Sequence, residues 1–231
     1  MRKGTRNALA AAGAVVLLAA GAAYWLYASL DGLVKRAIER WGPEITGVAV
    51  KVQGVKIEPA QGRGTIRGLF VGNPKGFEAP HALTLGEMRL TLDPASLAKD
   101  VIVVKELVLV APDVVYERGP GGNNLDVIQR HVDVWVAQHS GADSGPGKKL
   151  VIENAYVRDG KAHFGATLSA PLPDLHLRNI GKSSNGATAG EVVQQVWGAM
   201  LRSATGIASR LGSAVKEGAK GAAEGVKKLF K

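Results

Sequence analysis

The chain has 231 residues, no cysteine, and a formal net charge of +9, from 29 lysine and arginine against 20 aspartate and glutamate residues. This length suits one domain with extensions. The lack of cysteine excludes disulfides, thiolate zinc sites and cysteine nucleophiles. The positive charge favours an anionic partner such as lipid headgroups. Aromatic residues, at 5%, are too scarce for the stacking platforms that single-stranded nucleic acid needs. We therefore expect membrane lipids, and no nucleic acid, as partners.

An uncharged stretch at residues 8–30 follows the basic N-terminus. Its 23 residues would form a helix of about 35 Å, long enough to cross about 30 Å of hydrocarbon. The positive-inside rule then leaves residues 1–7 in the cytoplasm and exports the rest. We expect a retained anchor, although Ala20-Gly21-Ala22 would also suit a cleaved signal peptide. The anchor residues are Val15, Val16, Leu17, Leu18, Tyr24, Trp25, Leu26 and Tyr27.

Helical spacing of apolar residues continues beyond the anchor over residues 31–43, where Gly42-Pro43 is expected to end the helix. Residues 44–180 then show short β-like runs separated by turns, which predict an α+β fold with a curved, mainly antiparallel sheet. The expected strands are Val48–Glu58, Gly64–Val71, Leu83–Leu92, Val101–Val110, Asp113–Glu117, Leu150–Arg158, Lys161–Ser169 and Leu172–Ile180. The alternation of apolar residues changes phase at Gly54 and at Gly86, which predicts bulges that bend the sheet.

One run, VIVVKELVLV, is apolar on both faces apart from Lys105 and Glu106. In a strand with one solvent-exposed face, apolar and polar residues should alternate. Either protein covers both faces, or one face lines an apolar groove, and both interpretations stay open. The candidate groove residues are Val101, Ile102, Val103, Val104, Leu107, Val108, Leu109 and Val110.

A single helix is expected to interrupt the strands. Asn124 is its predicted N-cap, after the turn GPGGN. One face of this helix is apolar and carries Leu125, Ile128, Val132, Trp135 and Val136.

A flexible linker is predicted at residues 181–190, followed by a basic amphipathic helix at 191–231. Seven basic residues against three acidic ones suit an anionic membrane surface. Packing on the protein itself or on a partner, and disorder, are the alternatives, because six glycines weaken the helix. The residues expected to contact a membrane or a partner are Trp197, Met200, Leu201, Ile207, Leu211, Lys227, Lys228 and Phe230.

No motif in the chain indicates catalysis or a cofactor. The five histidines lack a metal-binding spacing, and no nucleophile elbow, phosphate-binding loop or zinc-protease motif occurs. We therefore expect neither an enzyme nor a cofactor.

Four stretches, in this order, resemble the AsmA-like family of bacterial envelope proteins. They are GRGTIRGLFVGNPKGF from Gly62, LTLGEMRLTLDPASL from Leu83, VIVVKELVLVAPDVVYERGPGGNNLDVI from Val101 and LVIENAYVRDGKAHF from Leu150. The resemblance covers about residues 1–180 and implies a single-pass inner-membrane anchor and a periplasmic curved sheet. It also implies a part in outer-membrane lipid homeostasis, with phospholipid as cargo or an envelope protein as partner. It brings no catalytic residues. About eight strands at 4.8 Å make a sheet of about 38 Å, too narrow to bridge two membranes as the large relatives do.

Overall fold

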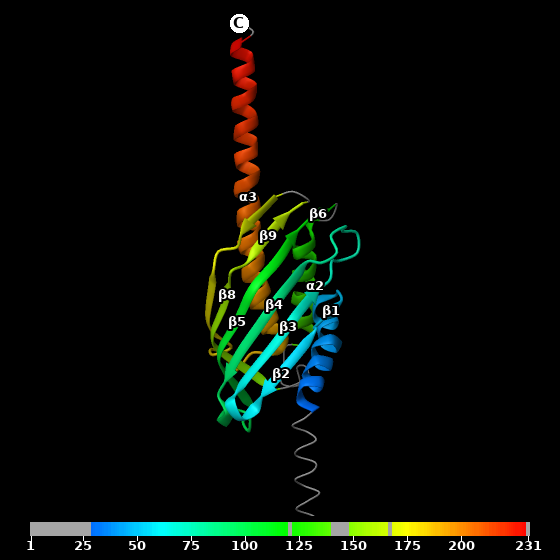
Figure 1. Ribbon diagram of the computed structural model, residues 1–231, viewed down its shortest axis with the longest axis vertical. Coiled ribbons are helices and arrows are strands. Elements are labelled where there is room, and N and C mark those ends of the chain that lie inside the picture. Colours follow the sequence, from blue (N-terminus) through cyan, green and yellow to red (C-terminus); the bar gives the residue numbers. More distant parts are fainter. Residues whose placement is uncertain (1–28, 120–121, 140–147, 166–167, 230–231) are drawn as a thin grey trace, which may run out of the picture.

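The computed structural model describes residues 29–119, 122–139, 148–165 and 168–229. These residues form an α+β fold in which a large, mostly antiparallel sheet carries three α-helices (Figure 1). The helices are the N-terminal helix (residues 29–46), α2 (Asn124–Gln138) and α3 (Ala189–Leu229). The strands are β1 (Val50–Lys51), β2 (Gly54–Glu58), β3 (Arg63–Val71), β4 (Leu83–Leu92), β5 (Val101–Tyr116), β6 (Arg118–Gly119), β7 (Gly122–Asn123), β8 (Lys149–Arg158), β9 (Lys161–Phe164), β10 (Leu168–Pro171) and β11 (Leu175–Ile180).

The main sheet has nine strands, with the order β1-β3-β4-β5-β8-β11; β2 also pairs with β3, and β9 joins β5 to β10. Neighbours are antiparallel except that β5 runs parallel to both β8 and β9. The chain passes from β5 to β8 through α2, as a parallel connection requires. The separate strand expected at Asp113–Glu117 is wrong: the pairing of β4 with β5 continues past Ala111, so one 16-residue strand forms.

A row of backbone kinks crosses the sheet at one level. The strand registers place these residues opposite one another: Gln53, Gly68, Gly86, Ala111 and Asp159. Gly68, Ala111 and Asp159 have left-handed φ angles of 60°, 51° and 57°. Because neighbouring strands change phase together, pairing continues on both sides of the row. The predicted change at Gly86 therefore lies in this row, whereas the change predicted at Gly54 occurs at Gln53, between β1 and β2.

A bulge in β5 explains the two charges in its apolar run. The register between β4 and β5 shifts at Thr91/Leu92, which leaves Lys105 as the extra residue of β5. Lys105 and Glu106 are exposed, whereas Val104 before the bulge and Leu107 after it are both buried. The bulge thus turns both apolar segments toward the helices.

The N-terminal helix lies along the edge of the sheet formed by β1 and β2 (Figure 1). Asp31 accepts a hydrogen bond from the Ile57 N–H at 2.7 Å, Glu39 accepts one from the Val52 N–H at 3.2 Å, and Lys35 donates to the Val52 carbonyl. These side chains satisfy backbone groups that an open edge would leave available for pairing.

The expected end of the N-terminal helix at Gly42-Pro43 is wrong, because the helix runs on to residue 46. Proline lacks an N–H donor and its ring crowds the carbonyl four residues before it, but its own carbonyl can still accept a hydrogen bond. The carbonyl of Pro43 still accepts from the Gly47 N–H at 2.9 Å, and the Thr46 hydroxyl donates to the Gly42 carbonyl at 2.7 Å. The helix ends instead at Gly47, whose φ of 73° leaves the helical region.

The N-cap of α2 is Asn123, one residue before the predicted position. The Asn123 side chain accepts from the Asp126 N–H at 2.8 Å, as an N-cap does. Asn124 is instead fully buried. The predicted apolar face of α2 packs into the core, where Leu125, Ile128 and Val132 are at most 1% exposed.

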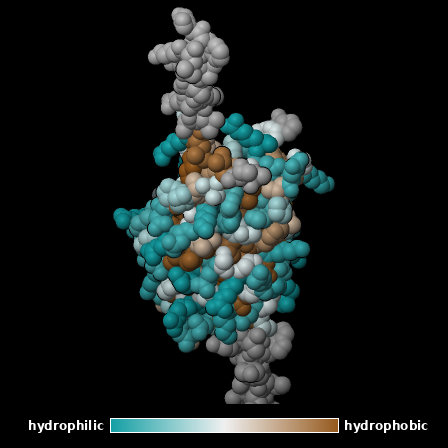
Figure 2. All heavy atoms as spheres, turned by 45° about the horizontal axis from the view of Figure 1, so that its top comes forward, coloured by the Kyte–Doolittle hydropathy of each residue, from teal (hydrophilic) through white to brown (hydrophobic). Residues whose placement is uncertain are grey.

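The first part of α3 packs beside α2 on the sheet, and its remainder extends beyond the body (Figure 1). The segment before it, predicted as a flexible linker, is a turn tied to β8: Leu150 and Ala187 exchange two backbone hydrogen bonds of 2.7 Å. Ala204 is fully buried, and Ala208 is the last of the α3 side chains described, which end at residue 213, to contact the core. Figure 2 shows hydrophobic side chains where α3 leaves the body.

Within the described ranges, which begin at residue 29, no helix is both long and apolar enough to cross a membrane. The predicted anchor residues, Val15 to Tyr27, lie outside the described part of the chain. The anchor therefore stays a prediction.

Candidate functional site: an apolar cavity between sheet and helices

The helices pack tightly against only part of the sheet face that they cover. A partly open cavity of about 1060 Å³ lies between the sheet, the N-terminal helix, α2 and the first turns of α3. This volume is at the upper limit of the range of about 300–1000 Å³ that is typical of ligand sites. The tightly packed core residues Leu85, Leu125, Ile128 and Val132 do not line the cavity but lie beside it.

The strands β3, β4 and β5 form most of the floor of the cavity, and Val50 of β1 and Leu150 of β8 line it on either side. The lining side chains of the three central strands are Ile66, Leu69 and Val71 of β3, Leu83 and Met88 of β4, and Val101, Leu107 and Leu109 of β5. Without the kinks at Gly68 and Gly86, regular alternation would place Ile66 and Leu69, or Leu83 and Met88, on opposite faces. The kinks therefore build a continuous apolar floor.

The helices form the walls and roof, and each contributes one tryptophan: Trp41, Trp135 and Trp197. Glycine lets α3 approach α2 closely, because a Cβ at Gly190 would lie only 2.3 Å from the Trp135 ring. The Trp197 indole donates a hydrogen bond to the Leu125 carbonyl at 3.3 Å, which holds the ring against α2. The walls are thus held by specific contacts between elements distant in sequence.

Of the eight predicted groove residues, three line the cavity: Val101, Leu107 and Leu109. Val104 is buried in the adjoining core. Val108 belongs to the opposite face and is only 4% exposed, since its neighbours across the strands are Arg89 and Tyr156, whose long side chains can shelter it. The remaining residues, Ile102, Val103 and Val110, are half-buried.

Two of the residues expected to contact a membrane or a partner, Trp197 and Met200, line the cavity instead and are 5% and 4% exposed. Leu201, Ile207 and Leu211 are half-buried. Lys227 and Lys228 lie in the part of α3 whose side chains are not described, and Phe230 lies outside the described residues. The early part of α3 therefore follows the interpretation in which the helix packs on its own domain.

Sequence analysis missed the helical walls, including Ile38, Trp41, Val193 and Val196. Their signal was present in the helical spacing of apolar residues over 30–41 and 193–204. That spacing predicts a buried face, but it does not say that two such faces meet above the same strands.

The cavity is long as well as apolar. Val101 and Leu109 lie eight residues apart on β5 and both line it, so along the strand it extends about 25 Å at about 3.3 Å per residue. One leaflet of a bilayer holds its acyl chains within half of about 30 Å. The cavity is therefore long enough for an extended acyl chain.

The polar lining residues gather at one end of the cavity. They are Asp100, Lys148, Lys149, Asn185 and Thr188; Thr46, the remaining polar residue, bonds its hydroxyl to the Gly42 carbonyl. In the described ranges no three histidine, cysteine, aspartate or glutamate side chains are arranged to hold a metal ion. The arrangement suits a ligand with a long apolar part and one polar end.

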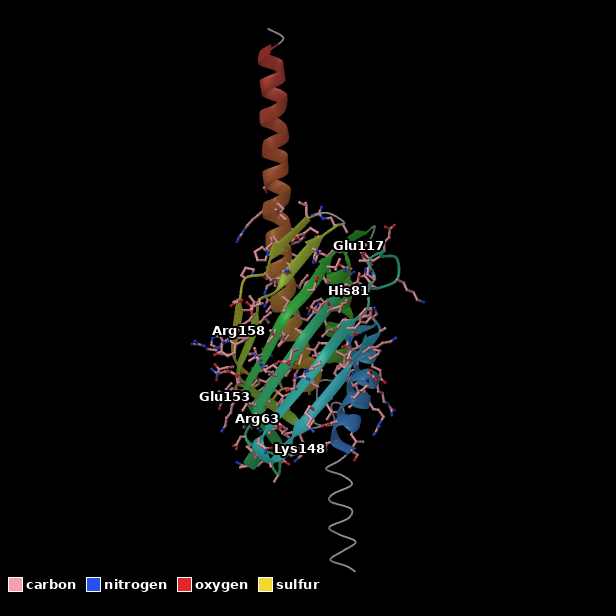
Figure 3. All side chains as sticks on the ribbon, in the orientation of Figure 1. Arg63, His81, Glu117, Lys148, Glu153 and Arg158 are labelled. Carbon is pink, nitrogen blue, oxygen red and sulfur yellow. The ribbon has the colours of Figure 1, made fainter. Side chains whose placement is uncertain are left out.

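A second polar cluster, outside the cavity, joins α2 to the turn after β3. Asn124 donates to Asn73 and to the Val115 carbonyl, both at 2.8 Å, and accepts from the Glu117 N–H at 2.9 Å. Glu117, at the upper end of the sheet in Figure 3, accepts from the N–H groups of Glu78 and Ala79 and from Asn73. Burial acts to raise the pKa of Glu117, but these hydrogen bonds together hold it below its ordinary value.

We expect the Glu117→Gln substitution to lower stability at neutral pH and to remove part of its acid dependence. A carboxyl whose folded-state pKa is lowered stabilises the fold above its unfolded-state pKa, and this contribution is lost as the pH falls through the folded-state pKa. The difference between wild type and E117Q in urea midpoint should therefore shrink over that acid range. The control is Glu106→Gln, which changes an exposed carboxylate on β5. A difference independent of pH would contradict this role.

No protein-family model matches the chain, and a comparison with curated proteins finds no match. The class of the protein is therefore defined by its fold and its site, namely an α+β domain with an elongated apolar cavity between a kinked sheet and three helices.

Proposed function

We propose that the protein handles lipids and binds acyl chains in the cavity between the sheet and the helices. The carrying observation is the apolar cavity of about 1060 Å³ that extends from Val101 to Leu109 along β5. Burial of a chain there is favourable by about 0.8 kcal/mol for each methylene. Rigid aromatic and flexible methionine side chains both line the cavity, and methionine adapts readily to irregular apolar ligands.

The proposed setting is the bacterial envelope. The uncharged residues 8–30 behind a basic N-terminus support a single-pass anchor in the inner membrane with a cytoplasmic N-terminus. The resemblance to the AsmA-like family supports a periplasmic domain with a curved sheet and a part in outer-membrane lipid homeostasis. The protein would act by binding rather than by catalysis, with phospholipid as its cargo.

The test is whether lipid leaves the membrane with the protein. The full chain, purified in mild detergent, should carry acyl lipid detectable by mass spectrometry, and Val193→Trp should remove most of it. Val193 lines the cavity on α3, so a larger ring there would occupy the space of the chain. Displacing two methylenes costs about 1.6 kcal/mol, more than tenfold in affinity.

The matched control is Val134→Trp, because Val134 lies on α2, is 55% exposed and does not line the cavity. This variant should keep the lipid. Lipid-free wild-type protein, or equal lipid on both variants, would contradict the proposal.

A second candidate function is that of a structural or adaptor protein, and the projecting part of α3 favours it. Beyond Ala208 about 20 residues of helix extend about 30 Å from the body. Residues 209–231 carry six basic and two acidic side chains. Such a helix would serve to recruit an envelope protein or an anionic membrane surface.

A further inference from the structure

Two lysines stand at the polar end of the cavity. Lys148 and Lys149 line it together with Asp100, Asn185 and Thr188, and the apolar residues Val101 and Leu150 adjoin them. We propose that these lysines bind the anionic headgroup of a lipid whose acyl chain occupies the cavity. This inference rests on the proposed acyl-chain binding and specifies the class of ligand.

The end of the cavity is built by three segments that meet there. The starts of β5 and β8 are neighbours, with Val101 opposite Lys149. The turn before α3 is fixed to β8 by the paired hydrogen bonds of Leu150 and Ala187. The contact is so close that a Cβ at Gly186 would lie 2.6 Å from the Lys149 Cβ and 3.4 Å from Val101. The backbone of Lys149 is therefore held in place by the sheet and by this turn.

The described lining leaves this end of the cavity with a net positive charge, because one carboxylate, Asp100, stands against two lysines. Neither Lys148 nor Lys149 forms a salt bridge with a described residue, and Asp100 is the acidic residue of the lining. Lys148 donates to the Leu97 carbonyl at 2.7 Å, which is a neutral partner. Both lysines are exposed, so an anionic headgroup can reach them from the solvent. The nearby N-terminus of α3 carries its own cap, in which the Glu191 carboxylate accepts from the Thr188 N–H and the Thr188 hydroxyl accepts from the Glu191 N–H.

The polar end of the cavity and the apolar part next to it suit different chemical groups. Two cationic side chains line the polar end of the cavity, and the apolar part, about 25 Å long, begins directly beside them. An amphiphile with an anionic head matches both parts at once, whereas a neutral apolar molecule would use only the channel. Figure 3 places Lys148 at the lower end of the molecule, the end at which the described chain begins. A predicted anchor at residues 8–30 would join the protein at this same end.

The test uses the full chain with Trp25→Phe in mild detergent, so that no tryptophan of the predicted anchor meets lipid in the micelle. The lipids carry brominated acyl chains, which quench tryptophan fluorescence on contact. Trp41, Trp135 and Trp197 line the cavity and report binding. Brominated phosphatidylglycerol and brominated oleate supply a phosphate and a carboxylate head, and brominated monoolein supplies a neutral one. Lys148→Gln/Lys149→Gln should weaken binding of one or both anionic ligands by up to about tenfold, because both lysines are exposed and each exposed ion pair contributes only modestly. Monoolein should bind as before.

The control is Lys105→Gln/Lys161→Gln, which removes two exposed lysines of the same sheet that do not line the cavity. It should leave all three ligands unaffected. If only phosphatidylglycerol binding is weakened, the ligand is a phospholipid. If only oleate binding is weakened, the ligand is a fatty acid. Equal weakening of monoolein, or no weakening at all, would overturn headgroup binding while leaving acyl-chain binding intact. Absence of quenching in the wild type would overturn both proposals.

Discussion

A chain that ends after Arg210 should fold, and its unfolding temperature should be close to that of the wild type. A chain that ends before Ala189 should not fold. The first part of α3 buries Val196, Trp197, Met200 and Ala204. Losing a buried tryptophan or methionine side chain costs about 2–5 kcal/mol each, and a domain has only about 5–15 kcal/mol in total. Thermal unfolding followed by circular dichroism, together with limited proteolysis, measures the difference.

The chain that ends after Arg210 also distinguishes between the two candidate functions. Among the α3 side chains that the structure describes, which end at residue 213, none beyond Ala208 contacts the core or lines the cavity, so removal of residues 211–231 should leave acyl-chain binding unchanged. If the projecting part of α3 recruits a partner or a membrane surface, the same truncation should abolish that recruitment. A truncated chain that unfolds at a much lower temperature would show that residues beyond Arg210 stabilise the body.

The Asn124→Ala substitution should destabilise the protein by about 3 kcal/mol, far more than its neighbour. The Asn124 side chain is fully buried and makes three hydrogen bonds that join α2, β5 and the turn at Asn73. Its removal leaves their partners, Asn73, Val115 and Glu117, without those bonds at about 1 kcal/mol or more each. Urea unfolding monitored by tryptophan fluorescence gives the free energy of unfolding.

Asn123→Ala is the control for that measurement, because Asn123 is the actual N-cap and its loss should cost about 1 kcal/mol. The sequence pattern alone predicts the reverse order, since it assigns the cap to Asn124. Equal effects of the two substitutions, or a larger effect at Asn123, would contradict the buried amide network.

Much of the fold could be predicted from local patterns. Alternating apolar residues located most strands, and the 3.6-residue period of Leu125, Ile128 and Val132 identified the buried face of α2. The phase change at Gly86 was visible because alternation reverses there within one strand. The kink at Ala111 was missed: it looked like a strand end, because Pro112 follows and the sequence does not show that β4 bends at the same level.

The candidate site could be predicted only in part. The apolar run in β5 indicated a groove, and Val101, Leu107 and Leu109 line the cavity. Lys148 and Lys149 carried no signal, since two lysines after a glycine-rich loop are typical of any exposed turn. They become a possible headgroup site only because the chain brings them to the open end of an apolar space.

The sequence by itself determined the type of most segments, because helix and strand periods and turn residues are local properties that each segment carries. It also determined the absence of thiol chemistry and the basic charge. Only the tertiary structure decided which apolar faces meet and where they fail to fill the space between them. That outcome depends on contacts such as Gly190 against Trp135 and on kinks shared by neighbouring strands, which join residues far apart in the chain. A cavity is a property of several packed elements together, so no single segment could predict it.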